Sequence, residues 1–208
     1  MDGVVSRGGG IPAGALLPGR ALALRAARLR LVITDVDGVL TDGGVYYSER
    51  GEALKRFSLR DGMGVELLRD AGIETAFMTR EDSPIVARRA EKLRVRHCYL
   101  GVADKRAALP RVQQEAGRHA GLEAGLDDGQ IAYIGDDVND LEIMAALGLR
   151  GLVGAPVDAI AAARARAHHV TRCPGGQGAF RDFADWLLEL RREARSPREG
   201  DTTYEGEL

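Results

Sequence analysis

The chain has little of what several specialised protein classes require. Only two cysteines, Cys98 and Cys173, occur in 208 residues, and they form no CxxC pair. This scarcity argues against a disulfide framework or a cysteine-based zinc site and favours a reducing compartment. Lys and Arg number 29 against 31 Asp and Glu, so the chain has no basic excess for nucleic acid. Because long apolar runs are also missing, we expect a cytoplasmic protein without a membrane span or signal peptide.

Aromatic residues are scarce as well, at 5% of a chain that is 45% hydrophobic and contains 27 glycines. A core made of aliphatic side chains, with many glycines left for loops, is typical of an α/β protein of one domain. Residues 1–22 are rich in Gly, Pro and Ala, and residues 196–208 show no periodicity. We therefore expect a single domain over 23–195 between a loose N-terminal extension and a loose C-terminal tail.

Short apolar runs alternate with helical patterns along this domain, and this alternation predicts a doubly wound parallel sheet. The expected strands are 31–35, 73–78, 97–100, 131–134, 150–153 and 168–171. The expected helices are 63–70, 83–93, 105–116, 138–147, 157–163 and 180–191, with Pro110 weakening the third. Residues 43–58 read instead as a β-hairpin that projects from the end of the first strand.

Two acidic clusters follow strands of the expected sheet. Asp35 and Asp37 come directly after the first strand, and Asp136, Asp137 and Asp140 follow the strand 131–134. The carboxyl ends of parallel strands share one edge, so these carboxylates are expected to converge there. Clustered carboxylates repel one another unless a cation lies among them. A hard, oxygen-liganded ion is required, and Mg²⁺ fits best.

Two further side chains complete a site for phosphoryl groups. Thr79 offers a hydroxyl at the end of the strand 73–78, and Lys105 offers an ammonium at a helix start. A nucleophilic carboxylate, a second carboxyl group, Mg²⁺, a hydroxyl and a lysine are what phosphoryl transfer through an aspartyl-phosphate needs. The alternative is that each residue is an ordinary solvated or helix-capping group. That alternative would require a coincidence across three strand ends.

The order of these motifs resembles that of the haloacid dehalogenase superfamily of phosphatases: DVDGVLTD, MT, DK and GDDVND. Within it, DGVLTDGGVYY, FSLRDGMG and PGGQGAFRD resemble the 3-deoxy-D-manno-octulosonate 8-phosphate phosphatase group, which includes phosphatases of nonulosonate (acylneuraminate-type) 9-phosphates. The resemblance implies that Asp35 is the nucleophile and Asp37 the acid and base. It also implies that Mg²⁺ is held by Asp35, Asp136 and the backbone carbonyl of Asp37. Thr79 and Lys105 would bind phosphate, while Asp137 and Asp140 would play secondary parts.

Substrate-binding residues depart from the pattern of the group at one place. Members often read ThrGlyArg or SerGlyArg at the second motif, whereas this chain has Thr79, Arg80 and Glu81. Glu81 looks more like the nonulosonate 9-phosphate branch, and Arg60 looks like the octulosonate branch. The sequence therefore predicts a sugar-acid phosphate as substrate, with octulosonate 8-phosphate preferred and a nonulosonate 9-phosphate as the alternative. A non-enzymatic phosphorylatable switch, or a homologue kept as an assembly partner, are further alternatives.

The resemblance also implies an assembly. No cap domain fits between the motifs, and a two-stranded hairpin carrying Val45, Tyr46, Tyr47, Leu54 and Phe57 cannot bury those side chains alone. In the octulosonate group such hairpins pack together in a tetramer, and a Gly-rich loop, here residues 174–178, reaches a neighbouring subunit's site. We therefore expect a homotetramer.

Overall fold

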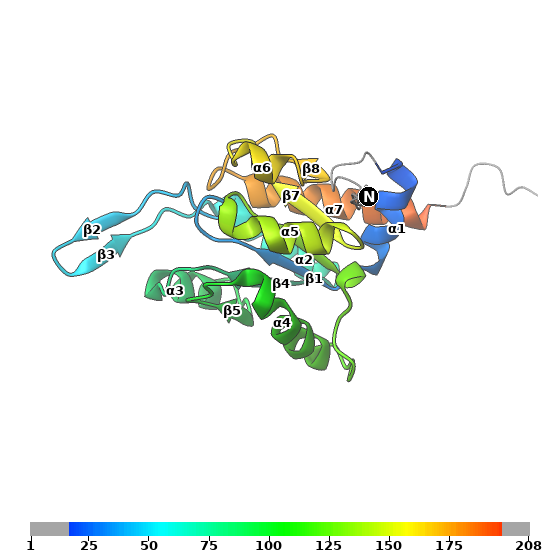
Figure 1. The fold of residues 1–208 in the computed structure, drawn as a ribbon, viewed down its shortest axis with the longest axis horizontal. Coiled ribbons are helices and arrows are strands. Elements are labelled where there is room, and N and C mark those ends of the chain that lie inside the picture. The colour runs from blue at the N-terminus through cyan, green and yellow to red at the C-terminus, as the bar shows by residue number, and fades with distance from the viewer. Residues whose placement is uncertain (1–16, 197–208) are drawn as a thin grey trace, which may run out of the picture.

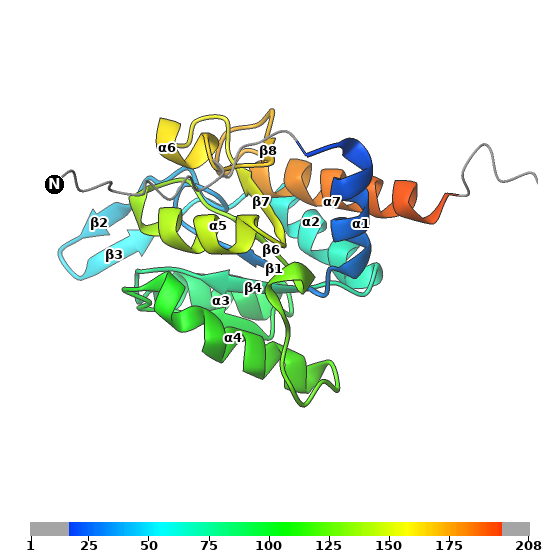
Figure 2. The ribbon, with the colours of Figure 1, turned by 45° about the vertical axis from the view of Figure 1, so that its right-hand side comes forward.

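The computed structural model describes residues 17–196, and its centre is a six-stranded parallel sheet (Figures 1 and 2). The strands lie in the order β5-β4-β1-β6-β7-β8, and every neighbouring pair is parallel. Their bounds are β1 Leu31–Thr34, β4 Glu74–Met78, β5 His97–Tyr99, β6 Ile131–Ile134, β7 Leu152–Ala155 and β8 His169–Val170. The order runs outward in both directions from β1. The predicted doubly wound sheet is confirmed, and the switch point lies between β1 and β6.

Helices cover both faces of the sheet. Successive side chains along a strand point to opposite faces, and both sets are apolar here, so both faces need cover. Val32 and Phe77 belong to the core on one face, and Ile33 and Met78 belong to the core on the other. The first face is covered by α1 Gly19–Arg28, α2 Leu59–Asp70, α3 Pro84–Lys92 and α7 Ala179–Arg195. The second is covered by α4 Lys105–His119, α5 Leu141–Gly148 and α6 Ala161–Arg164. Two 3₁₀ turns, η1 Asp128–Gln130 and η2 Val138–Asp140, flank β6.

The first helix, α1, corrects the expected N-terminal extension. We expected loose chain through residue 22, but α1 begins at Gly19 and packs along α7. Ala23 and Ala26 are its buried residues, and the Arg25 guanidinium donates to the backbone carbonyls of Gly148, Leu149 and Gly151. The sequence analysis assigned these residues to the extension because Gly and Pro are frequent just before the helix. Residues 1–16 of the expected extension and 197–208 of the expected tail lie outside the described residues.

Pro110 lies inside α4 without ending it. The helix continues for nine residues beyond Pro110 to His119. Proline removes the hydrogen bond to the carbonyl of Arg106, but both residues lie on the exposed side of the helix, where water can replace the missing donor. The expected helix over 157–163 is instead the shorter α6.

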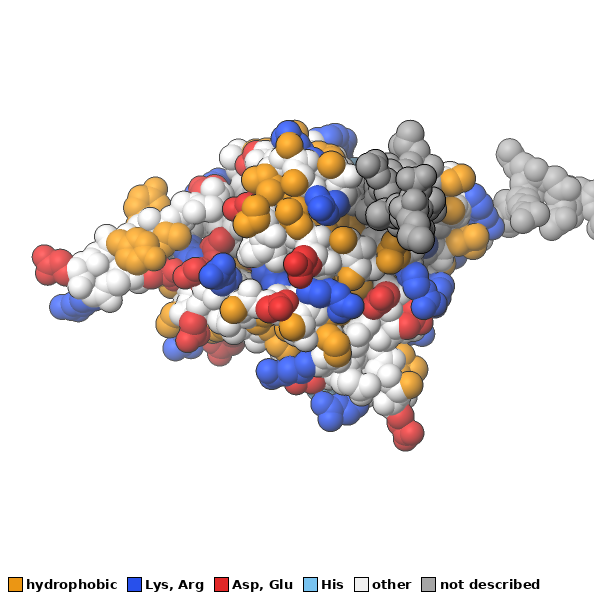
Figure 3. Space-filling view, in the orientation of Figure 1, with side chains coloured by type: hydrophobic (Ala, Val, Ile, Leu, Met, Phe, Trp, Pro, Cys, Tyr) orange, Lys and Arg blue, Asp and Glu red, His pale blue; other side chains and the backbone are white. Residues whose placement is uncertain are grey.

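The hairpin is confirmed as an antiparallel ribbon of β2 Tyr46–Ser48 and β3 Gly51–Leu54. It extends away from the body of the molecule in both ribbon views (Figures 1 and 2). Tyr46 and Tyr47 are 65% and 72% exposed, and Leu54 is 63% exposed, so the apolar load of the ribbon faces outward (Figure 3). Between β1 and α2 this hairpin is the only inserted element in the described chain.

Among the described helices, none has both the length and the hydropathy that crossing a membrane requires.

Candidate active site

Two neighbouring strand ends bring the predicted carboxylates together. Asp35 follows β1 and Asp136 follows β6, and these strands pair in parallel with Thr34 opposite Ile134. One carboxylate oxygen from each of Asp35, Asp136 and Asp140 lies within 4.8 Å of the others. A hollow of about 250 Å³ opens over this edge. Its lining is Asp35, Asp37, Thr79, Arg80, Glu81, Asp136, Asp137, Val138 and Asn139.

Asp35 lies at the floor of this hollow and is 4% exposed. Its Oδ1 accepts a hydrogen bond from the backbone N–H of Val36 at 2.7 Å and an ion pair from Lys105 Nζ at 2.8 Å. Burial, followed by the charge of Asp140, raises the pKa of Asp35 to about 7, although Lys105 opposes the shift. The carboxylate form is therefore costly in the bare protein and needs further positive charge.

Asp140 organises the site from below, because both of its oxygens are already engaged. Oδ1 accepts from Lys105 Nζ at 2.7 Å and from the Tyr133 hydroxyl. Oδ2 accepts from the backbone N–H groups of Asp136 and Asp137 at 2.8 and 3.2 Å. A carboxylate with four donors is held in one orientation. We infer that Asp140 positions Lys105 and the Asp136 backbone rather than binding a cation directly.

Asp136 has the opposite character, since its Oδ1 is buried and has no hydrogen-bond partner among the described residues. Burial, and then the charge of Asp35, raises the pKa of Asp136 to about 8. An unpartnered buried oxygen beside a second carboxylate is the kind of donor set that a hard divalent cation satisfies. The residues present therefore fit the expected Mg²⁺, with Asp35 and Asp136 supplying side-chain oxygens.

Gly38 allows the loop after β1 to approach Asp136. Its φ is +88°, and a Cβ at this position would lie 2.0 Å from Asp136 Oδ2. Only glycine fits, on both counts. The turn that carries Asp37 can therefore pass directly beside the carboxylate that follows β6.

Asp37 is held by a lysine that the sequence analysis did not identify. Lys55 Nζ lies 2.6 Å from Asp37 Oδ1 and 3.4 Å from Glu52 Oε2, and its side chain is 0% exposed. Burial lowers the pKa of Lys55, but the two carboxylates outweigh it and raise the pKa above its usual value. Glu52 lies three residues before Lys55, but the nearer partner, Asp37, comes from the loop after β1, so the local sequence does not identify Lys55 as part of the site.

Thr79 and Glu81 lie where the sequence predicted them, beside the carboxylates. The Thr79 hydroxyl is buried and lies 3.4 Å from Asp37 Oδ2. It also accepts a hydrogen bond from the Glu81 backbone N–H at 3.1 Å, while the exposed Glu81 side chain lines the hollow. Asp137 lies at the rim, where its carboxylate accepts from Val138 N–H at 2.7 Å.

Arg60 is not among the residues that line this hollow. It lines a separate one of about 430 Å³ at the start of α2, together with Arg56, Phe57, Ser58, Leu59 and Gln177. Within one chain the structure does not bring Arg60 to the carboxylates. Its assignment as a substrate-binding residue stays a prediction.

The Gly-rich loop at 174–178 packs against the loop that follows β1 in its own chain. The Gly176 N–H donates to the Val39 carbonyl at 2.9 Å, and a Cβ on Gly175 would lie 2.0 Å from the Gly38 carbonyl oxygen. The buried Asp61 carboxylate accepts from the N–H groups of Gly178 and Arg181. The loop thereby supports the turn that carries Asp37 from the side of α7.

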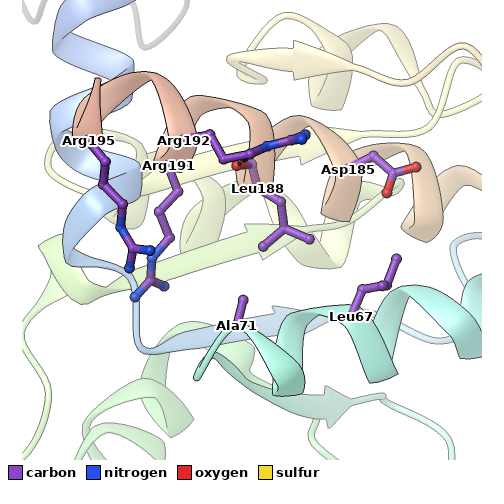
Figure 4. A pocket seen from close by; sticks show the side chains of 7 residues that line it. All are labelled: Leu67, Ala71, Asp185, Leu188, Arg191, Arg192 and Arg195. Carbon is purple, nitrogen blue, oxygen red and sulfur yellow. Dashed lines mark hydrogen bonds between the residues drawn. The ribbon is translucent and has the colours of Figure 1, made fainter. Parts of the chain in front are cut away.

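A third hollow, of about 380 Å³, lies between α2 and α7, away from the carboxylates. Figure 4 shows Leu67, Ala71 and Leu188 forming its apolar side, with Arg191 and Arg195 at one end and Asp185 at the other. It contains one carboxylate and no strand end. Of the hollow at the sheet edge and the hollow between α2 and α7, only the first therefore has a carboxylate cluster that could bind a cation.

No protein-family model matches the chain, but several known proteins are similar to it over most of its length. The 3-deoxy-D-manno-octulosonate 8-phosphate phosphatase of Haemophilus influenzae is 41% identical over 163 residues, which cover 78% of this chain and 84% of the relative. The enzyme of the same name from Yersinia pestis is 40% identical over 164 residues, covering 79% and 82%.

Solved structures give the same picture. The cobalt-bound phosphatase from Haemophilus influenzae is similar with a TM-score of 0.72 and 38% identity, covering 82% of this chain and 93% of that one. The Moraxella catarrhalis phosphatase, solved with a magnesium ion, a phosphate ion and the octulosonate sugar, is similar with a TM-score of 0.72 and 30% identity. That match covers 83% of this chain and 93% of the other.

Proposed function

This chain belongs to the 3-deoxy-D-manno-octulosonate 8-phosphate phosphatase family of the haloacid dehalogenase superfamily, and on that premise we propose that it hydrolyses this sugar-acid phosphate with Mg²⁺. The observation that carries the proposal is the pairing of Asp35 with Asp136, whose Oδ1 is buried and unpartnered, beside Lys105. These groups suit a phosphoryl group and a divalent cation bound together.

Asp35 is the nucleophile in this proposal. Its carboxylate oxygen attacks phosphorus, and the bond from phosphorus to the sugar oxygen breaks with the electron pair going to that oxygen. Asp37 donates its proton to the departing alkoxide, which leaves as the sugar acid. Lys105 and Thr79 are the phosphate-binding groups, because an ammonium and a hydroxyl at this edge offset the charge on the phosphoryl oxygens.

Water completes the reaction by attacking the aspartyl-phosphate. Asp37, now a carboxylate, takes a proton from the water, the bond from phosphorus to Asp35 breaks, and inorganic phosphate leaves. Mg²⁺ supplies positive charge that lets Asp35 react as a carboxylate and neutralises the phosphoryl oxygens. Asp35 and Asp136 would hold it with the Asp37 backbone carbonyl, and Asp137 is an outer acidic group of the site.

The relatives favour the octulosonate sugar over a nonulosonate 9-phosphate, the alternative that Glu81 raised. They also disfavour a non-enzymatic switch, since the matched proteins are named phosphatases. Glu81 lines the hollow, so its contribution is a change of preference among sugar-acid phosphates. Arg60 is the candidate for contact with the sugar acid from a neighbouring subunit.

The active enzyme is a homotetramer in this proposal. The exposed Tyr46, Tyr47 and Leu54 of the hairpin support it, because a ribbon of two strands cannot bury them alone. A cytoplasmic location is supported by Cys98 and Cys173, which form no disulfide.

Phosphate release from octulosonate 8-phosphate, a nonulosonate 9-phosphate and an unrelated sugar phosphate tests the proposed function. We expect Mg²⁺-dependent release, fastest with the octulosonate ester. Loss of release on chelation should be restored by added Mg²⁺. Faster hydrolysis of the nonulosonate ester would overturn the sugar assignment, and no release from any ester would overturn the phosphatase itself.

A further inference from the structure

A chain of polar contacts runs from the hairpin into the catalytic centre. Lys55 follows directly after β3, and its ammonium lies between Asp37 Oδ1 at 2.6 Å and Glu52 Oε2 at 3.4 Å. The other oxygen of Glu52 accepts a hydrogen bond from the Ser83 hydroxyl, and Ser83 is the residue before α3. Three separate segments of the chain thus meet at the base of the hairpin.

The Lys55 contact distinguishes the two oxygens of Asp37. Oδ1 receives the ammonium, with the Thr41 hydroxyl at a longer 3.4 Å. Oδ2 has only the Thr79 hydroxyl at 3.4 Å, and Thr79 lies on the wall of the hollow next to Asp35. Oδ1 is therefore occupied by its own chain, while Oδ2 faces the place where the phosphoryl group and the attacking water must lie.

Burial makes this contact specific. The Lys55 side chain is wholly inaccessible, whereas the Asp37 and Glu52 side chains are 23% and 18% exposed. Water cannot reach an ammonium that is enclosed in this way. Loss of its carboxylate partners would therefore leave a buried charge without compensation. The other cation of the centre, Lys105, is already committed to Asp35 and Asp140. Among the described residues, Asp37 thus depends on Lys55 for its charged partner.

We propose that Lys55 is a positioning residue that holds Asp37 by Oδ1 so that Oδ2 transfers the proton, with Glu52 holding Lys55 in turn. The inference rests on the proposed function, because it assigns a device to the same acid and base. It makes the hairpin part of the catalytic apparatus through its base as well as a surface for assembly. General acid and base catalysis depends on such placement, since the proton must lie within hydrogen-bond reach of the reacting oxygen.

Lys55→Met tests the proposal, because it keeps an unbranched apolar side chain that ends one atom short of the ammonium and removes the charge. General acid and base catalysis contributes about 10²- to 10⁴-fold, so we expect kcat to fall roughly 10- to 100-fold with KM changed less than about threefold. Lys55→Arg should recover part of the loss, and Glu52→Gln should lose less than Lys55→Met. Lys92→Met removes an exposed lysine from α3 and serves as the control with parental kinetics.

Two kinetic measurements separate positioning from a general structural effect. In the Asp37→Asn background, Lys55→Met should cost less than about threefold, because the group that it positions is already absent. With p-nitrophenyl phosphate the leaving group needs no proton, so only the hydrolysis step depends on Asp37. Acid-quenched Lys55→Met should then contain more phosphorylated Asp35 than the parent does. A KM raised tenfold at unchanged kcat would make Lys55 a substrate ligand, and an undiminished loss in the Asp37→Asn background would also overturn the proposal.

A structural measurement covers the case in which the variant or the substrate assignment fails. Crystal structures of the parent and Lys55→Met, both without Mg²⁺, should show the Asp37 carboxylate turned away from its parental orientation. An unchanged Asp37 side chain would overturn the inference even if the parent hydrolysed no ester. If the parent cleaves p-nitrophenyl phosphate but no sugar-acid phosphate, the proposed substrate fails while the Lys55 measurements remain decisive.

Discussion

Two fully buried lysines face the catalytic carboxylates from different regions of the molecule. Lys105 begins α4 at the edge of the sheet and contacts Asp35 and Asp140. Lys55 lies at the base of the hairpin and contacts Asp37 and Glu52. Both ammonium groups are shielded from water, yet the elements that carry them differ greatly in how they are held.

Several hydrogen bonds and ion pairs hold Asp35 and Asp140 at the sheet edge, whereas the strands of the hairpin pair only with each other. Asp140 alone accepts hydrogen bonds from a lysine, a tyrosine and two backbone N–H groups. The hairpin is an isolated two-stranded ribbon with exposed tyrosines, a form that is marginal without partners. The proposed nucleophile and the expected cation site therefore lie on the densely bonded region, while the proposed acid and base is tied to the hairpin, which we propose to be held by assembly.

The largest expected effect is the loss of the nucleophile on the densely bonded side. Asp35→Asn should lower kcat by at least about 10⁴-fold, since removing a nucleophile abolishes the covalent route. Asp136→Asn should instead raise the Mg²⁺ concentration needed for half-maximal activity. Steady-state phosphate release measures both, and Asp35→Asn with parental activity would remove Asp35 from its role.

A stability comparison between the regions comes next in size. Asp140→Ala leaves buried donors without partners and should cost about 3 kcal/mol of unfolding free energy. Glu52→Ala, at the base of the hairpin, should cost less, because the buried Lys55 ammonium keeps Asp37 as its nearer partner. Urea unfolding of both variants measures the difference. Equal losses would mean that the hairpin base is as firmly built as the sheet edge.

Mg²⁺ should act on the sheet edge, where two carboxyl groups with raised pKa values also respond to pH. The raised pKa values of Asp35 and Asp136 mean that the fold retains protons which the unfolded chain loses near pH 4. The contribution of these two groups to the stability of the metal-free protein should therefore fall as pH rises from about 4 towards 8, through both folded-state pKa values. His168, whose pKa burial lowers from 6.5 to about 4, contributes in the opposite direction between those two values. The raised pKa of Lys55 lies above this window, so the Lys55 ammonium itself stays charged throughout it.

Thermal unfolding at pH 5 and pH 8, with chelator or Mg²⁺, measures this response. Mg²⁺ at a hundred times its Kd adds about 2.7 kcal/mol. At one fixed Mg²⁺ concentration the gain should be larger at pH 8, where fewer protons compete for the carboxylates. The same gain at both pH values would contradict a carboxylate site with raised pKa values.

The hairpin can be broken separately through its exposed tyrosines. Tyr46→Glu with Tyr47→Glu should dissociate the tetramer and lower kcat/KM about tenfold, because charges replace the apolar contact of the ribbon. Sedimentation measures the assembly, and Leu149→Glu, at an exposed site away from the hairpin, is the control. A monomer with full activity would refute the need for assembly.

The smallest expected effect concerns sugar preference at the rim. Glu81→Arg should shift the ratio of kcat/KM between octulosonate 8-phosphate and a nonulosonate 9-phosphate by roughly three- to tenfold, the scale of a partly exposed charge contact. Glu123→Arg, on an exposed loop, controls for the change in net charge. An unchanged ratio would show that Glu81 does not discriminate between these sugars.

Sequence reasoning succeeded where a local pattern determines a place in the fold. Apolar runs predicted the strands, and their parallel order was enough to place Asp35 beside Asp136. It failed where partners come from distant segments: Lys55 contacts Asp37 from another loop, and α1 packs mainly against α7 at the other end of the domain. It also could not separate Asp140, whose oxygens are all engaged, from Asp136, because both are acidic residues of one motif.

The packing of α1 against α7 has a consequence for how the chain is made. The ribosome synthesises Ala26 early, but Phe183 and Leu187, which belong to the same core as Ala26, follow about 160 residues later. At 5–20 residues per second this interval is roughly 8 to 32 seconds. During that time α7 is not yet available to cover the apolar side of α1. The nascent chain therefore depends on the segments made before α7, or on a chaperone, to avoid aggregation.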